Sequence, residues 1–235
     1  MTVDLEARLE RRFRTRETVI DLERRQVRIL HPANADDLIS EEDFIRDERM
    51  PYWADLWPSA RVLARHLLDA PPPEDDIVEL GCGVALPSLA LRRLGRDPLA
   101  TDYYQEALRF ARANAERNGL GPLRTAILDW RAPPAALRPQ LVLAADVLYE
   151  LRNVLALGEL LPQVLAPGGR VLLADPGRVY QAEFRSRMHF AGWRVAEVDV
   201  RSEVSDAATG ATSTVRIFEL RRRPDGDQAQ EEATA

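Results

Sequence analysis

A strand, a tight glycine turn and the start of a helix follow one another in residues 76–90, and this unit constrains the fold most strongly. Residues 77–80 favour a buried strand. Gly81 and Gly83 allow the backbone to turn sharply and a ligand to approach it closely. The apolar run beginning at Val84 predicts a helix whose free N–H groups face the same point. This order of elements is a general nucleotide-binding device.

Two carboxylates are associated with this unit. Glu79 stands at the end of the strand, and Asp102 ends a second strand-like run at residues 98–102. An acid about 20 residues beyond such a turn can accept hydrogen bonds from both hydroxyls of a ribose. The third glycine of the dinucleotide fingerprint is missing because Leu86 stands there, which counts against a NAD-dependent dehydrogenase.

From residue 76 onward, strand and helix patterns alternate, which predicts an α/β fold with a parallel sheet and helices on both faces. The predicted strands occupy residues 77–80, 98–102, 124–130, 141–150 and 170–175. The predicted helices occupy residues 84–95, 105–118, 152–165 and 181–191. Two late strands without a helix between them, residues 194–200 and 213–220, predict an antiparallel hairpin at one sheet edge.

Three regions are expected along the chain. Residues 1–75 form an N-terminal segment, residues 76–220 the core domain, and residues 221–235 a disordered tail. The N-terminal segment is expected to contain the following elements: a helix over 1–16, strands over 18–22 and 26–30, a loop with a helical turn over 32–49, and a helix over 59–68 that begins near Pro58.

Composition argues against several classes of protein. The net charge of −6 gives no general attraction to nucleic acid or to an anionic membrane. The single cysteine, Cys82, excludes an internal disulfide and fits a reducing compartment, and its place in the glycine turn indicates packing. One cysteine and three scattered histidines predict no metal site. Neither a signal peptide nor a run of 18 apolar residues is found, so we expect a cytoplasmic protein.

Acidic residues end most of the predicted strands. Glu79, Asp102, Asp129, Asp146 and Asp175 are each the last polar group of a hydrophobic run. Any one of them could be a helix cap or a turn aspartate. The carboxyl ends of parallel strands lie at one sheet edge, where α/β folds bind ligands, so the set predicts a site beside the first core strand.

An aromatic segment precedes the core domain. Tyr52, Trp53 and Trp57 lie within residues 50–60, close to the start of a predicted helix. At least one of these rings is expected to pack in the core, and one could cover a ligand at the glycine turn. The sequence leaves open which ring does which.

With these motifs the chain resembles the class I S-adenosylmethionine-dependent methyltransferases, whose Rossmann-like fold has a seven-stranded sheet. Glu79-Leu-Gly-Cys-Gly83 resembles their glycine motif. More narrowly, three stretches resemble the protein-lysine methyltransferases of this fold: residues 53–60, Leu128-Asp129-Trp130, and the acid-x-x-aromatic motif in Ala145-Asp-Val-Leu-Tyr149. Residues 175–178 and 212–215 resemble most the enzymes that methylate the β-subunit of electron-transfer flavoprotein.

The resemblance implies S-adenosylmethionine as methyl donor, S-adenosylhomocysteine as product, a protein substrate, and 76–220 as the donor-binding domain. It implies that Asp146 orients the target amine and that Tyr149 walls its channel, which makes both catalytic residues. Residues expected to bind the donor are Trp57, Glu79, Gly81, Gly83, Asp102, Asp129, Trp130 and Ala145. Neither nucleic acid nor membrane is expected as a partner, and the oligomeric state stays open.

Other functions fit parts of the same pattern. A small-molecule N-methyltransferase would use the same donor site and differ only in its acceptor pocket. A non-catalytic scaffold that binds S-adenosylmethionine could keep the fold, although Asp146 and Tyr149 argue against decay. A nucleic-acid methyltransferase is disfavoured by the negative net charge and by the lack of an Asn-Pro-Pro-Tyr-like motif.

Overall fold

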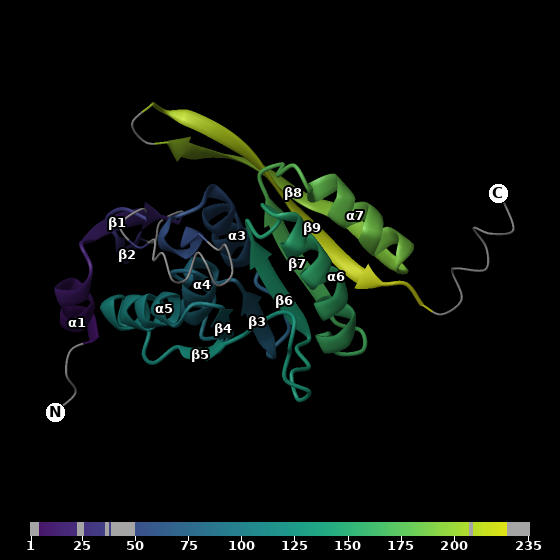
Figure 1. The fold of residues 1–235 in the computed structure, drawn as a ribbon, viewed down its shortest axis with the longest axis horizontal. Coiled ribbons are helices and arrows are strands. Elements are labelled where there is room, and N and C mark those ends of the chain that lie inside the picture. Colours follow the sequence, from purple (N-terminus) through teal and green to yellow (C-terminus); the bar gives the residue numbers. More distant parts are fainter. Residues whose placement is uncertain (1–4, 23–25, 36–37, 39–49, 207–208, 225–235) are drawn as a thin grey trace, which may run out of the picture.

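A seven-stranded sheet in the order β5-β4-β3-β6-β7-β9-β8 forms the centre of the molecule (Figure 1). The computed structural model describes residues 5–22, 26–35, 38, 50–206 and 209–224. The strands are β3 (Ile77–Leu80), β4 (Leu99–Asp102), β5 (Arg124–Ile127), β6 (Leu141–Ala145), β7 (Arg170–Asp175), β8 (Trp193–Asp206) and β9 (Ala211–Arg222). The pairs among β3 to β7 are parallel, whereas β9 runs antiparallel to β7 and β8 antiparallel to β9. The predicted fold class is confirmed.

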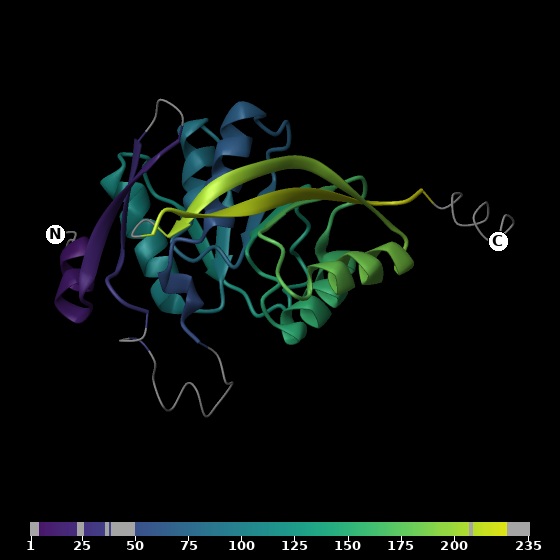
Figure 2. The same ribbon diagram turned by 90° about the horizontal axis from the view of Figure 1, so that it is seen from above.

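Helices cover both faces of this sheet (Figures 1 and 2). One face carries α3 (Pro58–Asp69), α4 (Leu86–Arg93) and α5 (Gln105–Arg117), and the other carries α6 (Leu151–Val164) and α7 (Gln181–Phe190). Side chains along β6 alternate between the faces: Leu141 and Leu143 pack with α3, and Val142 and Ala144 pack with α6. Burial on both faces explains why the core strands read as continuous apolar runs. No helix within the described ranges is long and apolar enough to cross a membrane.

The N-terminal segment packs against α5. It contains α1 (Leu5–Arg12), the strands β1 (Thr15–Asp21) and β2 (Gln26–Pro32), and the short 3-10 helix η2 (Tyr52–Ala54). The two strands expected here pair as a separate two-stranded antiparallel sheet. The Asn114 side chain accepts a hydrogen bond from the Leu30 backbone N–H at 2.7 Å and donates one to the Leu30 carbonyl at 3.0 Å. The segment therefore shares a hydrophobic core with helices α4 and α5 of the central domain.

Several predicted boundaries were wrong. The first helix ends at Arg12, because the chain enters β1 at Thr15. The helix after the glycine turn begins at Leu86, because Ala85 adopts a left-handed backbone with φ of 66°. Residues 128–130 and 146–150 continue no strand, because the chain leaves the sheet there to turn side chains toward a cavity.

The last two strands are longer than predicted and form a hairpin that extends over α3 (Figure 1). Polar side chains hold this extension to α3: the Asp199 carboxylate lies 2.9 Å from His66 Nδ1, and Glu203 forms an ion pair with Arg65. Because charged residues alternate along this part of β8, the sequence has no apolar run there that would predict a strand. Strand β9 continues to Arg222, beyond the predicted start of the tail. Residues 1–4, most of the predicted loop over 32–49, and residues 225–235 of the tail lie outside the described residues.

Candidate active site

A cavity of about 330 Å³ lies at the carboxyl ends of the central strands. The chain continues from β3 to β4 and β5 on one side and returns to β6 and β7 on the other, so the strand order reverses between β3 and β6. Open α/β sheets bind ligands at this kind of switch point. The ten residues expected to bind the donor or to act in catalysis all line the cavity: Trp57, Glu79, Gly81, Gly83, Asp102, Asp129, Trp130, Ala145, Asp146 and Tyr149.

The glycine turn brings other groups close to the cavity floor. Gly81 and Gly83 have positive φ angles of 62° and 51°. A Cβ atom on Gly83 would lie 3.0 Å from the backbone oxygen of Trp53, and one on Gly81 would lie 3.4 Å from the Trp130 ring. Gly83 is thus required twice, for the turn itself and for the close approach of Trp53, whereas Gly81 is required chiefly for the positive φ angle of the turn.

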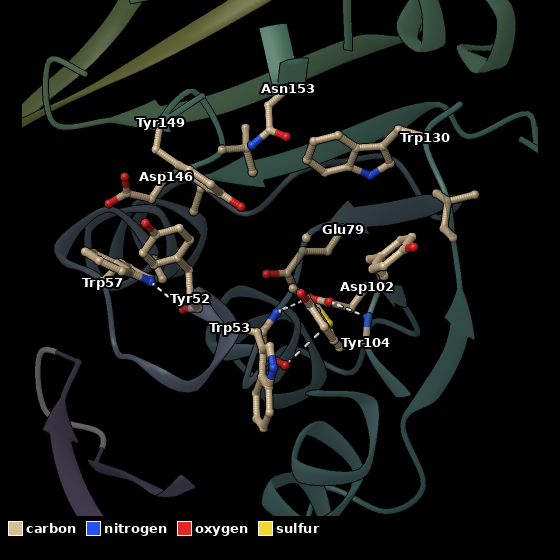
Figure 3. Close-up of a pocket in the computed structure, with 18 of the residues that line it drawn as sticks. Tyr52, Trp53, Trp57, Glu79, Asp102, Tyr104, Trp130, Asp146, Tyr149 and Asn153 are labelled. Carbon is tan, nitrogen blue, oxygen red and sulfur yellow. Dashed lines mark hydrogen bonds between the residues drawn. The ribbon is translucent and has the colours of Figure 1, made fainter. Parts of the chain in front are cut away.

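Asp102 closes this turn from the neighbouring strand. One carboxylate oxygen accepts a hydrogen bond from the Gly83 N–H at 2.9 Å, and the other accepts one from the Tyr104 N–H at 2.9 Å. Each carboxylate oxygen can accept more than one hydrogen bond, so the group can also meet ligand hydroxyls. In Figure 3, Asp102 lies at the cavity end that also holds Trp130 and Tyr104.

Glu79 is buried beneath the same turn, at 2% exposure. Its carboxyl group accepts hydrogen bonds from the Ser88 backbone N–H at 2.9 Å and from the Ser88 hydroxyl. Burial raises the pKa of Glu79 to about 8; the Ser88 bonds oppose this rise, and the nearby charge of Asp102 adds to it. Burial also raises the pKa of the Cys82 thiol, which agrees with its interpretation as a packing residue.

Trp130 and Asp129 enter the cavity from the loop after β5. Figure 3 shows the Trp130 indole ring on the upper side of the cavity. The Asp129 carboxylate forms a two-point ion pair with Arg131, with Nε–Oδ1 at 2.9 Å and Nη2–Oδ2 at 2.7 Å. Any ligand bound by Asp129 would share it with this guanidinium, so Trp130 is the stronger candidate of the two.

The opposite end of the cavity is aromatic and acidic (Figure 3). The rings of Tyr52 and Tyr149 meet edge to face with centroids 4.9 Å apart, and the Trp57 indole N–H donates to the Tyr52 carbonyl at 2.8 Å. Trp53 instead packs into the core, with its ring centroid 5.7 Å from that of Phe110. All three rings thus border the cavity, and Trp53 is the one that also packs into the core.

Asp146 lies at this end with a left-handed backbone, φ 59°. Its side chain is 1% exposed and is held on both sides. The Ser59 hydroxyl donates to Oδ2 at 3.2 Å, and the Arg178 Nε–H donates to Oδ1 at 2.6 Å. Burial raises the pKa of Asp146, while the Arg178 guanidinium opposes that rise.

Ser59 and Arg178 were not among the residues expected at the site. Arg178 also places its guanidinium 5.1 Å from the Trp57 ring centroid. The sequence carried one indirect indication, the Pro-Gly turn directly after Asp175. Asp175 itself does not line the cavity and acts as a turn aspartate, as the more conservative interpretation allowed. Its Oδ1 accepts hydrogen bonds from the Gly177 N–H at 2.7 Å and the Arg178 N–H at 2.8 Å.

Comparison with known protein sequences gives a family match. A family model described as lysine methyltransferase matches residues 44–189. The electron transfer flavoprotein beta subunit lysine methyltransferase of Danio rerio is 30% identical over 183 residues, which are 74% of this chain and 68% of that protein. A ribosomal protein L11 methyltransferase of Thermus thermophilus is 33% identical over 144 residues, or 61% of this chain. The match spans 53%, about half, of that second relative.

Solved structures share the fold. A ribosomal protein L11 methylase from Lactobacillus delbrueckii superposes with a TM-score of 0.54 at 17% identity, covering 70% of this chain and 79% of that one. The glycopeptide N-methyltransferase MtfA, complexed with sinefungin, superposes with a TM-score of 0.53 at 14% identity, covering 72% and 95%. At these identities the likeness concerns the fold alone.

Proposed function

The chain belongs to the lysine methyltransferase family of class I S-adenosylmethionine-dependent enzymes, and we propose that it methylates lysine side chains of a protein substrate. One observation carries the proposal. A single cavity joins an end suited to a nucleoside, with Asp102 and Trp130, to an end suited to an amine, with Asp146 and Tyr149. A transfer reaction needs both reactants held in contact, and this geometry supports it.

The donor end fits an adenosyl group. The Asp102 carboxylate can accept from ribose hydroxyls, the Trp130 indole offers a face for adenine, and Gly81 lets the ligand approach the backbone. Ala145 is small and ends β6 beside this turn. When bound, S-adenosylmethionine supplies an electrophilic methyl group on a positively charged sulfur.

The acceptor end controls the charge of the incoming amine. Free lysine has a pKa of about 10.4, so its amine must lose a proton before it can act as a nucleophile. The Tyr52 and Tyr149 rings provide apolar walls that lower this pKa, whereas a nearby carboxylate raises it. Asp146 is therefore better suited to orient the ammonium on arrival than to remove its proton. The aromatic rings then favour the neutral amine, because they replace water around it.

We propose the β-subunit of electron-transfer flavoprotein as the first substrate to test. The Danio rerio relative, 30% identical to this chain, is named for that activity. The Asp175–Arg178 turn, which the sequence analysis connected with the same enzymes, contributes to the acceptor end of the cavity through Arg178. The negative net charge of −6 gives no support to a nucleic-acid substrate.

The test uses purified chain with tritiated S-adenosylmethionine and, separately, purified electron-transfer flavoprotein and a whole-cell lysate. Label on a lysine of the β-subunit, found by mass spectrometry and lost in Asp146→Asn, supports the full proposal. Label on a lysine of another protein supports the protein-lysine methyltransferase activity but contradicts the proposed substrate. Label confined to small molecules favours the small-molecule N-methyltransferase. Donor binding without any label favours a scaffold.

A further inference from the structure

We propose that Arg178 is a positioning residue of the acceptor end: its guanidinium fixes the Asp146 carboxylate and the Trp57 ring in the arrangement that receives the amine. The inference rests on the proposed function for its catalytic part. Arg178 joins the two groups directly, with Nε 2.6 Å from Asp146 Oδ1 and its guanidinium 5.1 Å from the Trp57 ring centroid. No sequence motif at the site had assigned it a role.

Hydrogen bonds within the loop that carries Arg178 fix the position of its backbone. Asp175, fully buried at the end of β7, accepts hydrogen bonds from the backbone N–H groups of Gly177 and Arg178 and from the Gln181 side chain at 2.8 Å. Gly177 takes a φ of 91°, which only glycine adopts readily. Strand β6 lies beside β7, and the Asp146 N–H donates to the Ala174 carbonyl at 2.9 Å. The loop and the acid are therefore held together.

Asp146 needs such a partner because of its surroundings. Its side chain is almost fully buried, and a buried carboxylate is costly unless it is paired. The groups that act on its charge come from the elements packed around it: Arg178 stabilises the ionised form, Asp175 opposes it, and Ser59 on α3 adds a hydroxyl donor. Arg178 is thus the counter-charge that opposes the rise in the pKa of Asp146 caused by burial and by the neighbouring Asp175.

Arg178 also ties the acid to the aromatic wall. Trp57 is fixed on one side by its hydrogen bond to the Tyr52 carbonyl, and Tyr52 packs edge to face on Tyr149. The guanidinium over the Trp57 face completes a continuous contact from Asp146 to Tyr149. Removing it should misplace the acid and loosen the rings together, with little direct effect on the donor end.

The experiment compares wild type with Arg178→Met and Arg178→Lys. Arg187→Met is the matched control, because Arg187 lies on α7, is half exposed and pairs with Glu183 of the same helix at 2.8 Å. Methyl transfer to the labelled protein is measured from pH 6 to 9, donor affinity by calorimetry, and unfolding temperature at pH 5 and pH 8. The unfolding measurements are repeated with each Arg178 substitution combined with Asp146→Asn. These measurements need no acceptor protein.

In Arg178→Met, we expect kcat to fall about 10²-fold, as misplacement of reacting groups produces, with donor affinity unchanged. The acidic limb of the kcat profile should move to higher pH by about 1–3 units, because loss of the guanidinium raises the pKa of Asp146. In Arg178→Lys, the pH profile of kcat should be close to that of wild type, because the lysine keeps the positive charge beside Asp146. The unfolding temperature should fall more at pH 8 than at pH 5, and Asp146→Asn should remove this difference.

Two results would overturn the inference. One is a wild-type pH profile in an active Arg178→Met enzyme; the other is a loss of stability that is equal at both pH values and persists in Asp146→Asn. Either leaves the proposed function standing if wild type still labels a lysine. If wild type labels no protein, the proposed function fails, and the unfolding series still decides whether Arg178 holds Asp146 ionised.

Discussion

The two ends of the cavity are built in different ways. The donor end comes mainly from residues 79–83 and the neighbouring Asp102, so a short stretch of chain and one adjacent strand define it. The acceptor end is assembled from residues 52–59, 146–149 and 175–178, which come from distant parts of the sequence. Backbone geometry defines the first, and side-chain pairing of a buried charge defines the second.

This difference indicates which property, donor affinity or turnover, each end of the cavity controls. The donor end depends on φ angles and on hydrogen bonds that the carboxyl groups of Glu79 and Asp102 accept from nearby residues. The acceptor end depends on the ion pair between Asp146 and Arg178. We therefore expect substitutions at the donor end to change affinity and stability, and substitutions at the acceptor end to change turnover.

The largest effect is expected for Asp146→Asn. The amide keeps the size of the side chain but removes the charge that orients the amine, so kcat should fall about 10²-fold or more. Donor affinity by calorimetry should stay within about threefold, because the donor end keeps its contacts. A comparable loss of donor affinity would show that the two ends are one functional unit, and unchanged turnover would remove Asp146 from the mechanism.

Glu79→Gln should have the next largest effect, on stability. The pKa of Glu79 is raised to about 8, above its ordinary 4.5, so its contribution is full below pH 4.5 and is lost as pH rises through 8. Between pH 5 and pH 7, this group alone should lower the free energy of unfolding by about 2–3 kcal/mol. Glutamine resembles the protonated acid and should flatten that part of the profile in urea unfolding. A profile unchanged by the substitution would show that Glu79 ionises normally.

Asp102→Ala should weaken donor binding about 10- to 150-fold, the cost of a hydrogen bond to a charged group. Turnover at saturating donor should change much less, because the acceptor end is intact. Asp97→Ala is a suitable control, since Asp97 is exposed and pairs on the surface with Arg92 at 2.7 Å. A calorimetric titration that finds the same affinity in Asp102→Ala and wild type would refute the ribose assignment.

The same contrast explains how much the sequence could predict. The alternating strand and helix pattern and the turn at Gly81 were readable because local spacing specifies them. The cavity-lining positions Asp102, Trp130 and Asp146 were readable because strand ends meet at one edge of a parallel sheet.

What the sequence missed depends on contacts between distant segments. The pairing of Arg178 and Ser59 with Asp146 joins three elements, and nothing in their local sequence sets that geometry. Two boundary errors have the same origin, because Ala85 and Asp146 adopt left-handed backbones, with φ of 66° and 59°, that the local sequence does not specify. Sequence patterns therefore described the donor end better than the acceptor end.

The smallest effect is expected at His31, in the strand β2 behind the aromatic segment. His31 is fully buried and shares a hydrogen bond with the Thr18 hydroxyl at 2.9 Å. Burial lowers its pKa to about 4, helped by the charges of Arg16 and Arg61 and opposed by the backbone of Ala54 in η2. The buried ring of His31 therefore lies close to η2, the helical turn that carries Tyr52.

Acid should lower the stability that His31 contributes, in the opposite direction to Glu79. The folded pKa lies below the ordinary 6.5, so the contribution of His31 is full above pH 6.5 and is lost as pH falls toward 4. From pH 7 to pH 5.5 it should cost about 1 kcal/mol, or roughly 2–4 °C in unfolding temperature. His31→Gln should remove this dependence, whereas His189→Gln, at an exposed position on α7, should keep it. Of the two ends of the cavity, only the acceptor end lies near this histidine, so His31→Gln should change the acid response of that end alone. Tyrosine and tryptophan fluorescence measured against pH would check this. If both ends lose structure at the same pH in wild type and in His31→Gln, the two ends are not supported independently.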